Sequence, residues 1–364
     1  MTHPENDARY TGLKVNAGVS SNPSINPYRK VVRKKRILTP GEYVEGILKG
    51  DVSLLGRAVT LIESTAEAHQ AIAQEVIEKC LPYSGNSRRI GITGVPGAGK
   101  STSIDVFGTH VIRQGHKLAV LAIDPSSERT RGSILGDKTR MEKLSLEQDA
   151  FIRPSPSSGS LGGVARKTRE TIVLCEAAGY DRIFVETVGV GQSETAVHSM
   201  VDFFLLIQLA GTGDELQGIK RGIMEMADGI AINKCDGDNI ARCQLAAQQF
   251  RTALMLFPPT PSKWVPEVVT YSGYYEIDIE KVWDMIDRYF AYVEGNGYFE
   301  RKRNEQARYW MTETIEEQLK SRFYHTPGIR ELMEQKEMRV LNNEQSSFVA
   351  AKDILDFYFN SLRR

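Results

Sequence analysis

From residue 88 onward, short apolar runs alternate with longer segments in which apolar residues recur at helical spacing. Runs that are apolar throughout are typical of strands that are buried on both faces, as in parallel sheets. The alternation therefore predicts an α/β domain over residues 87–294, with a mostly parallel, doubly wound sheet covered by helices. The expected strands are 89–94, 117–123, 150–153, 181–186, 202–209, 228–233 and 267–271.

The segment before this domain is predicted to be an N-terminal helical extension over residues 39–86. Its first helix begins at Thr39-Pro40-Gly41-Glu42, which has capping-box spacing and a proline at the first helical position. Helical patterns follow at about 53–63 and 66–81, and we expect the three helices to pack on one another and on the sheet domain. Residues 1–38 are rich in Asn, Ser and Pro and end in a basic run, which favours a flexible basic tail.

Beyond the sheet, the chain is predicted to be helical. A stripe from Ile277 to Phe290 is expected to pack on the sheet, and a glycine-rich break follows at 295–297. A long charged helix is expected from about 298 to 322, with shorter helices ending near Leu362. Residues 295–364 thus form a C-terminal helical arm. Its Trp310, Ile315 and Leu319 could face a partner, or the helices could fold back on their own domain.

Composition is ordinary for a globular protein, with 41% hydrophobic and 25% charged residues. The net charge of zero argues against nucleic acid or an anionic membrane as the main partner. The sequence contains no apolar run near the roughly 20 residues that cross a bilayer, and its N-terminus does not resemble a signal peptide. The four cysteines form no C-x-x-C pair, which argues against a zinc knuckle and favours a reducing, cytoplasmic setting.

The strongest chemical signal lies between the first strand and the next helix, which is expected from 102 to 113. It fits G-x-x-x-x-G-K-[ST] at every fixed position, and strand, loop and helix follow in the order that a phosphate-binding P-loop requires. Its glycines allow backbone N–H groups to turn toward an anion. Lys100 would reach the β- and γ-phosphates, and the Ser101 hydroxyl would hold Mg²⁺. The expected nucleotide-binding residues here are Gly94, Val95, Pro96, Gly97, Ala98, Gly99, Lys100, Ser101 and Thr102.

A second motif, Asn233-Lys234-Cys235-Asp236, follows the sixth strand and indicates which base is bound. The Asp236 carboxylate would accept from guanine N1–H and from the exocyclic amine, a donor pair that adenine lacks. Asn233 would brace the loop, and Lys234 would lay its aliphatic stem on the purine. Backbone N–H groups at the end of the last strand, at Ser272 and Gly273, could reach guanine O6. Together with the P-loop, this motif predicts GTP and GDP as ligands.

Acidic residues at other strand ends are candidates for the metal and for hydrolysis. Glu186, followed by Gly189, stands where nucleotide hydrolases carry an acid and a γ-phosphate-sensing glycine. Asp124 follows the second strand, where it either helps to hold Mg²⁺ or caps the next helix, and Asp137 is a further candidate ligand. The expected catalytic residues are Lys100, Glu186 and Gly189.

The expected rate of hydrolysis is low. In Ras-type proteins a water-orienting glutamine follows the glycine, whereas here Val190 follows Gly189 and Gln192 is three residues from that glycine. We therefore predict slow intrinsic hydrolysis that a partner or a rearrangement accelerates. The Gly-rich, charged segment 211–222 follows the fifth strand and is predicted to be a mobile element, with an ordinary loop and capped helix as the alternative.

These motifs together resemble the MeaB/ArgK-type P-loop GTPases, relatives of the human methylmalonic aciduria type A protein. The resemblance covers about residues 40–364, so the basic tail lies outside it. Each of its most specific pieces falls at a strand end or in a loop that we expect to bind nucleotide. They are residues 94–101, 122–127, 132–141, 185–194, 214–220 and 233–236.

This resemblance implies a GTP-driven chaperone of adenosylcobalamin-dependent methylmalonyl-CoA mutase, which gates cofactor loading and protects the mutase. It also implies that the C-terminal arm forms a homodimer. The implied Mg²⁺ contacts come from Ser101, Asp124, Asp137 and Glu186. The implied switch residues are Gln192, Asp214, Glu215, Gln217 and Lys220.

Two further enzyme classes share parts of this pattern. An ArgK-like kinase would act on a basic amino-acid transport protein, but the N-K-x-D motif disfavours ATP and no separate acceptor-binding motif is present. A metal-insertion GTPase of the hydrogenase or urease type would need a His-rich tract or paired cysteines, and the six histidines are scattered. A non-enzymatic scaffold would leave two intact nucleotide motifs without a role.

Overall fold

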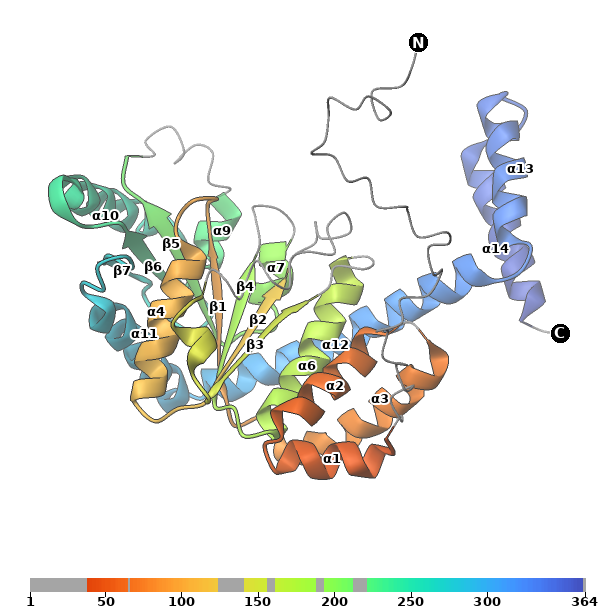
Figure 1. Ribbon diagram of the computed structural model, residues 1–364. Coiled ribbons are helices and arrows are strands. Elements are labelled where there is room, and N and C mark those ends of the chain that lie inside the picture. The colour runs from red at the N-terminus through yellow and green to blue at the C-terminus, as the bar shows by residue number, and fades with distance from the viewer. Residues whose placement is uncertain are drawn as a thin grey trace, which may run out of the picture. The chain divides into compact units, whose positions relative to one another are not determined.

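A computed structural model describes residues 38–64, 66–123, 141–155, 161–187, 193–211 and 221–362 (Figure 1). A seven-stranded parallel sheet with the order β3-β2-β4-β1-β5-β6-β7 confirms the predicted α/β architecture. All seven predicted strands are present, within one or two residues of the expected bounds. They are β1 (Arg88–Gly94), β2 (Leu118–Ile123), β3 (Ala150–Ser155), β4 (Arg182–Thr187), β5 (Phe203–Leu209), β6 (Gly229–Asn233) and β7 (Glu267–Thr270).

The strand order decides which loops become neighbours. Strand β1 lies between β4 and β5, and its register with β4 pairs Ile92 with Glu186. The chain crosses from β1 over β4 to reach β2, so the loops that follow β1 and β4 diverge at one point of the carboxyl edge. Ligands of open α/β sheets bind at such a point.

Helices cover both faces of the sheet because its strands are apolar on both. On one face, Ile90 and Ile92 of β1 belong to the core shared with α4 (Lys100–Arg113) and α11 (Ile279–Gly295). On the other face, Gly91 makes room for Phe204 and for Val201, which a Cβ at that position would meet within 3 Å. Helices α6 (Leu161–Ala177) and α7 (Ser193–His198) contact the strands, and α9 (Arg221–Met226) and α10 (Ile240–Leu254) connect β5, β6 and β7.

The N-terminal extension consists of α1 (Pro40–Leu48), α2 (Val52–Glu63) and α3 (Glu67–Cys80), as predicted. The capping box is present: the Glu42 backbone N–H donates to Thr39 Oγ1 at 3.3 Å, and the Thr39 N–H donates to Glu42 Oε2 at 2.7 Å. The three helices pack on one another and on α6, which confirms the expected contact with the sheet domain. The predicted basic tail lies outside the described residues, apart from Leu38.

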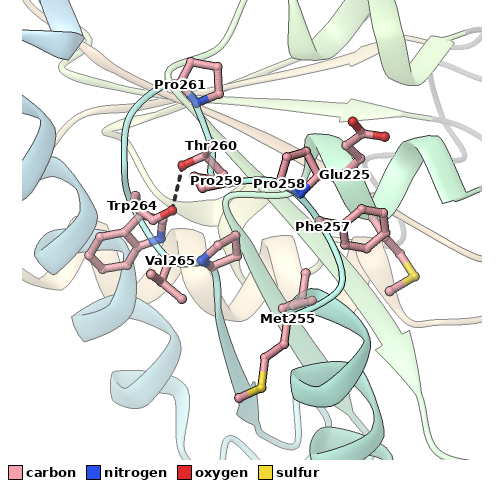
Figure 2. A pocket seen from close by; sticks show the side chains of 12 residues that line it. Glu225, Met255, Phe257, Pro258, Pro259, Thr260, Pro261, Trp264 and Val265 are labelled. Atoms are coloured by element: carbon pink, nitrogen blue, oxygen red, sulfur yellow. Dashed lines mark hydrogen bonds between the residues drawn. The ribbon is translucent and has the colours of Figure 1, made fainter.

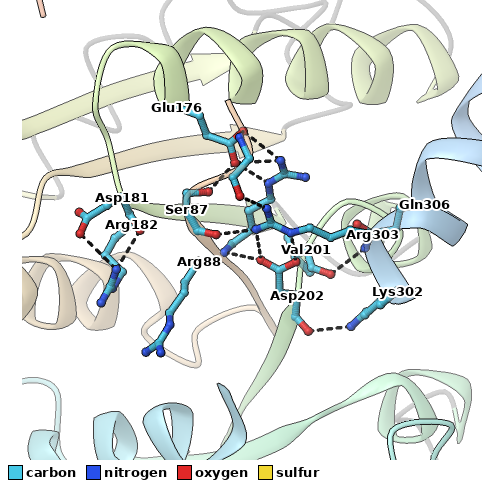
Figure 3. A network of polar contacts seen from close by, with 12 residues as sticks. Ser87, Arg88, Glu176, Asp181, Arg182, Val201, Asp202, Lys302, Arg303 and Gln306 are labelled. Atoms are coloured by element: carbon cyan, nitrogen blue, oxygen red, sulfur yellow. Dashed lines mark hydrogen bonds and ion pairs between the residues drawn. The ribbon is translucent and has the colours of Figure 1, made fainter. Parts of the chain in front are cut away.

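The long helix α12 (Tyr298–His325) is attached to the sheet by polar groups (Figure 3). Arg303 donates to both carboxylate oxygens of Asp202, at 2.9 and 2.8 Å, and that carboxylate is buried. Lys302 donates to the Asp202 carbonyl at 2.7 Å, and Gln306 donates to the Val201 carbonyl at 2.9 Å. Although burial raises the pKa of Asp202, Arg303 and Arg89 together outweigh this effect and hold that pKa below its usual value.

Replacing Arg303 with alanine is expected to lower the free energy of unfolding by about 3 kcal/mol, because it leaves the Asp202 carboxylate buried without its guanidinium partner. Urea unfolding of the purified variant measures this effect. Arg308→Ala is the matched control, since Arg308 lies on the same helix and is exposed. Equal stability of the two variants would show that the ion pair does not anchor α12.

The remaining helices, α13 (Ile329–Leu341) and α14 (Ser347–Ser361), pack on each other. For Trp310 the structure supports the second of the two alternatives, contact with the chain's own domain. Its indole N–H donates to the Ser199 carbonyl at 3.0 Å, and the Arg169 guanidinium lies over its ring. Ile315 and Leu319 are exposed, as expected. Among the helices in the described ranges, none is long and apolar enough to cross a membrane.

Candidate functional site

The loop between β1 and α4 depends on three glycines. Gly97 and Gly99 have φ of +79° and +88°, which side chains other than glycine adopt at a cost. Gly94 passes so close to β5 that a Cβ would lie 2.2 Å from the Ile207 carbonyl oxygen. Because Gly99 caps the helix, α4 begins at Lys100, two residues earlier than the apolar pattern predicted. The loop therefore wraps around the N-terminus of a helix, where backbone N–H groups and the helix dipole favour an anion.

Replacing Gly94 with alanine is expected to destabilise the fold by about 2 kcal/mol, because the added methyl group collides with a backbone atom in the β1–β5 ladder. Chemical denaturation measures the loss. Gly56→Ala is the control: Gly56 lies inside α2 with open space around it, so alanine there should stabilise the helix by roughly 0.5–1 kcal/mol. A Gly94→Ala protein as stable as the wild type would mean that β1 and β5 are not packed this closely.

Lys100 lies over the loop that precedes it. Its ammonium group donates to the Gly94 carbonyl at 2.8 Å and lies 3.4 Å from the Val95 carbonyl. Burial lowers the pKa of Lys100, while the Glu186 and Glu194 carboxylates raise it. A cation in this place faces the concave side of the loop, where the phosphates of a nucleotide would lie.

Two oxygen ligands of the kind that Mg²⁺ prefers lie beside Lys100. The Ser101 hydroxyl lies 3.4 Å from Glu186 Oε1, and Glu186 is buried although it is acidic. Strand pairing explains their proximity, since Glu186 is the last residue but one of β4, which pairs with β1, the strand that leads into the phosphate loop. A further hydrogen bond of 2.9 Å joins the Thr187 and Thr93 hydroxyl groups of these two strands.

Sequence reasoning gave no separate role to Glu194, although it lies in one of the quoted motifs. Glu194 is in the first turn of α7, is almost fully buried, and is one of the two carboxylates that raise the pKa of Lys100. A glutamate in the first turn of a helix is common and favoured by the helix dipole, so the sequence pattern did not distinguish it. The structure adds it to the residues around the phosphate loop.

Asn233 connects the loop of the second motif to the phosphate loop. Its side-chain amide donates to the Ala98 carbonyl at 2.8 Å, and its side-chain oxygen accepts from the Lys234 N–H at 2.7 Å and from the Gly273 N–H at 2.9 Å. A Cβ on Gly99 would lie 2.6 Å from the same amide nitrogen. One buried side chain thus fixes three loops relative to one another.

Asp236 is oriented by the end of the last strand. The Ser272 hydroxyl donates to Asp236 Oδ2 at 2.6 Å, while the Ser272 N–H donates to the Ile277 carbonyl. The backbone N–H groups of Ser272 and Gly273, which were expected to reach the base, therefore bind within the chain. A second connection that the sequence did not indicate joins the Tyr271 and Ser103 hydroxyl groups at 2.6 Å.

The structure thus brings the phosphate loop, Glu186 and the loops at 233–236 and 272–273 to one edge of the sheet. In the part of the chain that is described, no group of three or more His, Cys, Asp or Glu residues could hold a metal ion. Of the four expected metal ligands, Ser101 and Glu186 are described. The expected site residues outside the described ranges are Asp124, Asp137, Gly189, Gln192, Asp214, Glu215, Gln217 and Lys220.

A separate cavity of about 470 Å³ lies between α9 and the segment 254–266 that follows α10 (Figure 2). Its lining is mostly apolar and includes Met255, Phe257, Pro258 and Trp264, and among the described residues Glu225 is its single charged side chain. Helix α10 starts beside the Asn233 loop and ends at this cavity, so the two places are separated by the length of the helix. The described part of this lining has no lysine or arginine, so it does not suit a triphosphate.

Comparison with known proteins identifies relatives over most of the chain. The profile of the family described as methylmalonyl-CoA mutase-associated GTPase MeaB matches residues 55–327. A probable GTPase of Mycobacterium tuberculosis is 48% identical over 307 residues, which cover 84% of this chain and 91% of that protein. The GTPase ArgK of Escherichia coli is 43% identical over 319 residues, covering 88% and 96% of the two chains.

A mitochondrial relative and a solved structure extend these matches. The mouse methylmalonic aciduria type A homolog is 43% identical over 320 residues, covering 85% of this chain and 77% of that protein. The crystal structure of a LAO/AO transport system kinase superposes with a TM-score of 0.71 at 35% identity, covering 89% of this chain and 99% of the other. The fold and sequence comparisons therefore agree over most of the chain.

Proposed function

This chain belongs to the family of methylmalonyl-CoA mutase-associated GTPases, and on that premise we propose that it is a GTP-hydrolysing chaperone of a cobalamin-dependent mutase. It gates the loading of adenosylcobalamin into methylmalonyl-CoA mutase, or into a related mutase, and protects that enzyme from inactivation. The observation that carries the nucleotide part of the proposal is the Asn233–Ala98 hydrogen bond, because it fixes a base-reading loop against a phosphate loop. The mutase part rests on the family.

Guanine is read by Asp236 in this proposal. The Ser272 hydroxyl holds one carboxylate oxygen, so the group has a fixed orientation when it accepts from guanine N1–H and the exocyclic amine. Lys234 is exposed beside it and has a φ of +62°, a conformation in which its stem can cover the purine. Ser272 and Gly273 act as positioning residues for Asp236 and Asn233, because their own N–H groups are engaged within the chain.

Mg²⁺ fits the oxygen groups beside the phosphate loop. The Ser101 hydroxyl and the Glu186 carboxylate are the hard donors that this ion takes, and they lie within one ion's reach of each other. Asp124 and Asp137 complete the proposed set. When bound, Mg²⁺ would neutralise charge on the β- and γ-phosphates.

Hydrolysis requires this chain to hold the triphosphate and to orient a water molecule. Lys100 stabilises the charge that develops on the transferred phosphoryl group, and the N–H groups of the phosphate loop bind its oxygens. Glu186 polarises the attacking water or holds the water shell of the metal, and the Gly189 N–H senses the γ-phosphate. Because Val190 occupies the position of the Ras-type glutamine, intrinsic turnover is slow.

In this proposal, the switch residues signal to the partner whether GTP or GDP is bound. Gln192 lies three residues after Gly189, the γ-phosphate-sensing glycine. The other four precede α9 and are Asp214, Glu215, Gln217 and Lys220. Contacts to the γ-phosphate would order these segments and hydrolysis would release them. The mutase then distinguishes the GTP form from the GDP form.

The C-terminal arm is proposed to form a homodimer. Helices α12 to α14 leave several large apolar side chains exposed, including Ile315, Leu319 and Phe348, the last with 86% of its surface accessible. Exposed apolar groups that gather on one part of a molecule mark protein–protein interfaces. Sedimentation equilibrium of the full chain tests this, and a monomer at micromolar concentration would contradict it.

A kinase that phosphorylates a basic amino-acid transport protein is the second candidate, favoured by the likeness to the solved LAO/AO transport system kinase. Phosphate transferred to a protein, rather than released from GTP, would support it. A metal-insertion GTPase of the hydrogenase or urease type is a weaker alternative, since the described residues hold no group of metal-binding side chains.

The proposed function predicts slow GTP turnover by the protein alone and a rise of about tenfold or more when the mutase is added. Release of inorganic phosphate from GTP, measured with and without methylmalonyl-CoA mutase, tests both parts. ATP serves as the control substrate, and mutase alone serves as the control protein. Turnover that does not respond to the mutase would exclude methylmalonyl-CoA mutase as the client and leave the GTPase assignment intact. Turnover of ATP but not of GTP would overturn the assignment of guanine as the base.

A further inference from the structure

Two cysteines lie at the base-reading loop. Cys235 is the third residue of the Asn233–Asp236 motif, and Cys243 belongs to the first turn of α10. The Cys243 sulfur lies 3.8 Å from the Lys234 carbonyl oxygen and 3.9 Å from the Asn233 carbonyl oxygen. It is therefore packed directly beneath the backbone that carries Cys235.

The Cys243 sulfur also lies close to the start of Cys235, because the Lys234 carbonyl that it contacts is bonded to the Cys235 nitrogen. Burial raises the pKa of Cys243 to about 12, and the nearby Cys235 thiol contributes to the rise. Cys235 is partly exposed, whereas Cys243 is fully buried. The Asn239 amide contacts both parts of this cluster: it donates to the Lys234 carbonyl at 2.8 Å and lies 3.5 Å from the Cys243 sulfur. Cys235 is thus the cysteine that an oxidant can reach, and the buried Cys243 sulfur lies beneath its backbone.

We propose that Cys235 and Cys243 form a reversible disulfide that weakens the binding of guanine nucleotides. The inference deepens the proposed function and rests on the role of Asp236 in reading guanine. The remaining cysteines, Cys80 and Cys175, belong to α3 and α6 and are fully buried. Oxidation is therefore expected at the base-reading loop, where it can affect nucleotide binding.

The chemistry needs a peroxide as the two-electron oxidant. The Cys235 sulfur attacks hydrogen peroxide, the O–O bond breaks, and a sulfenic acid and one water form. The Cys243 sulfur then attacks the Cys235 sulfur, and the S–O bond breaks. The departing hydroxide takes the Cys243 proton and leaves as a second water. Each sulfur is oxidised, the peroxide is reduced, and a dithiol restores both thiols by exchange.

A disulfide would disturb the loop because its residues have little freedom. The Cys235 N–H donates to the Tyr271 carbonyl at 3.0 Å, and the next residue, Asp236, is held by the Ser272 hydroxyl. Drawing the Cys235 sulfur onto α10 shifts the backbone between these two contacts. A carboxylate displaced from the two guanine donors loses charge-assisted hydrogen bonds, so affinity should fall about tenfold or more.

The test uses the full-length protein, purified with a dithiol and then freed of it. Affinity for a fluorescent GDP analogue is measured before peroxide treatment, after it, and after the dithiol is returned. Peptide mapping by mass spectrometry identifies the linked cysteines. We expect a Cys235–Cys243 link, an affinity about tenfold lower, and recovery on reduction. Cys243→Ala and Cys235→Ser should each abolish both the link and the loss of affinity.

Three outcomes contradict the inference. The first is a link that forms without changing affinity, and the second is a peroxide-treated wild type without the link. The third is an equal loss of affinity in Cys243→Ala or Cys235→Ser, which would assign the effect to other residues. Each of these leaves the GTPase proposal intact if the reduced protein binds GDP. Reduced wild-type protein that does not bind guanine nucleotides would overturn both.

Discussion

Replacing Lys100 with alanine is expected to lower GTP turnover by about a thousandfold. The ammonium group is half-buried over the phosphate loop, where burial lowers its pKa and two carboxylates, Glu186 and Glu194, raise it. A cation in such a water-poor site acts more strongly on developing phosphate charge than it would in water. Its removal also takes away a positive charge that interacts with both carboxylates.

Phosphate release under saturating GTP measures this effect, and the free energy of unfolding shows whether the variant is folded. Lys281→Ala is the control, because Lys281 is exposed and pairs with Asp278 at the start of α11. Lys100→Ala protein that is folded and still turns over GTP at the wild-type rate would remove Lys100 from the proposed mechanism. Loss of turnover together with loss of folding would require the same assay on Lys100→Arg.

The sheet could be predicted from the sequence because its strands are buried on both faces. All six residues of β2 are buried, so the run is apolar regardless of what packs on it. The phosphate loop could also be predicted, since its glycines and Lys100 act through local backbone geometry. Strand order and register depend on contacts between distant segments, and no local pattern contains them.

The arm shows where apolar periodicity fails. Helix α12 contacts the sheet domain with Lys302, Arg303 and Gln306, which are polar residues that a hydrophobic pattern assigns to solvent. Burial of such groups is offset by ion pairs and by hydrogen bonds to backbone carbonyls, which only the tertiary structure reveals. The sequence left the position of Trp310 open for the same reason, because its hydrogen-bond partner, the Ser199 carbonyl, lies 111 residues away.

The candidate site, like the fold, could be predicted only in part. Each loop could be recognised by its own motif, but the connections between loops could not. Ser103 and Tyr271 are 168 residues apart, and Asn233 reaches Ala98 across 135 residues. These hydrogen bonds hold the base-reading loop and the phosphate loop at a fixed spacing. Because this spacing is fixed, a base that does not fit the base-reading loop also misplaces the phosphates.

Asp236→Asn is expected to change the preferred nucleotide from GTP to xanthosine triphosphate. The Ser272 hydroxyl donates to Asp236 Oδ2, so in the variant it should hold the amide oxygen at that position. The amide nitrogen then replaces Oδ1 and offers a donor. Guanine presents a second donor there, so GTP loses one hydrogen bond and leaves two donors facing each other. Xanthine carries a 2-oxo acceptor at this position and keeps its N1–H.

The affinity for GTP should fall about a hundredfold, since a charge-assisted hydrogen bond is lost and a polar group is left unpaired. Xanthosine triphosphate should bind the variant more tightly than it binds the wild type. Competition against a fluorescent GDP analogue measures the wild type, and competition against its xanthosine counterpart measures the variant. Asp238→Asn is the control, because Asp238 is an exposed acid two residues further along the same loop. Unchanged GTP affinity in Asp236→Asn would mean that this carboxylate does not read the base, and the disulfide inference, which rests on that role, would fail with it.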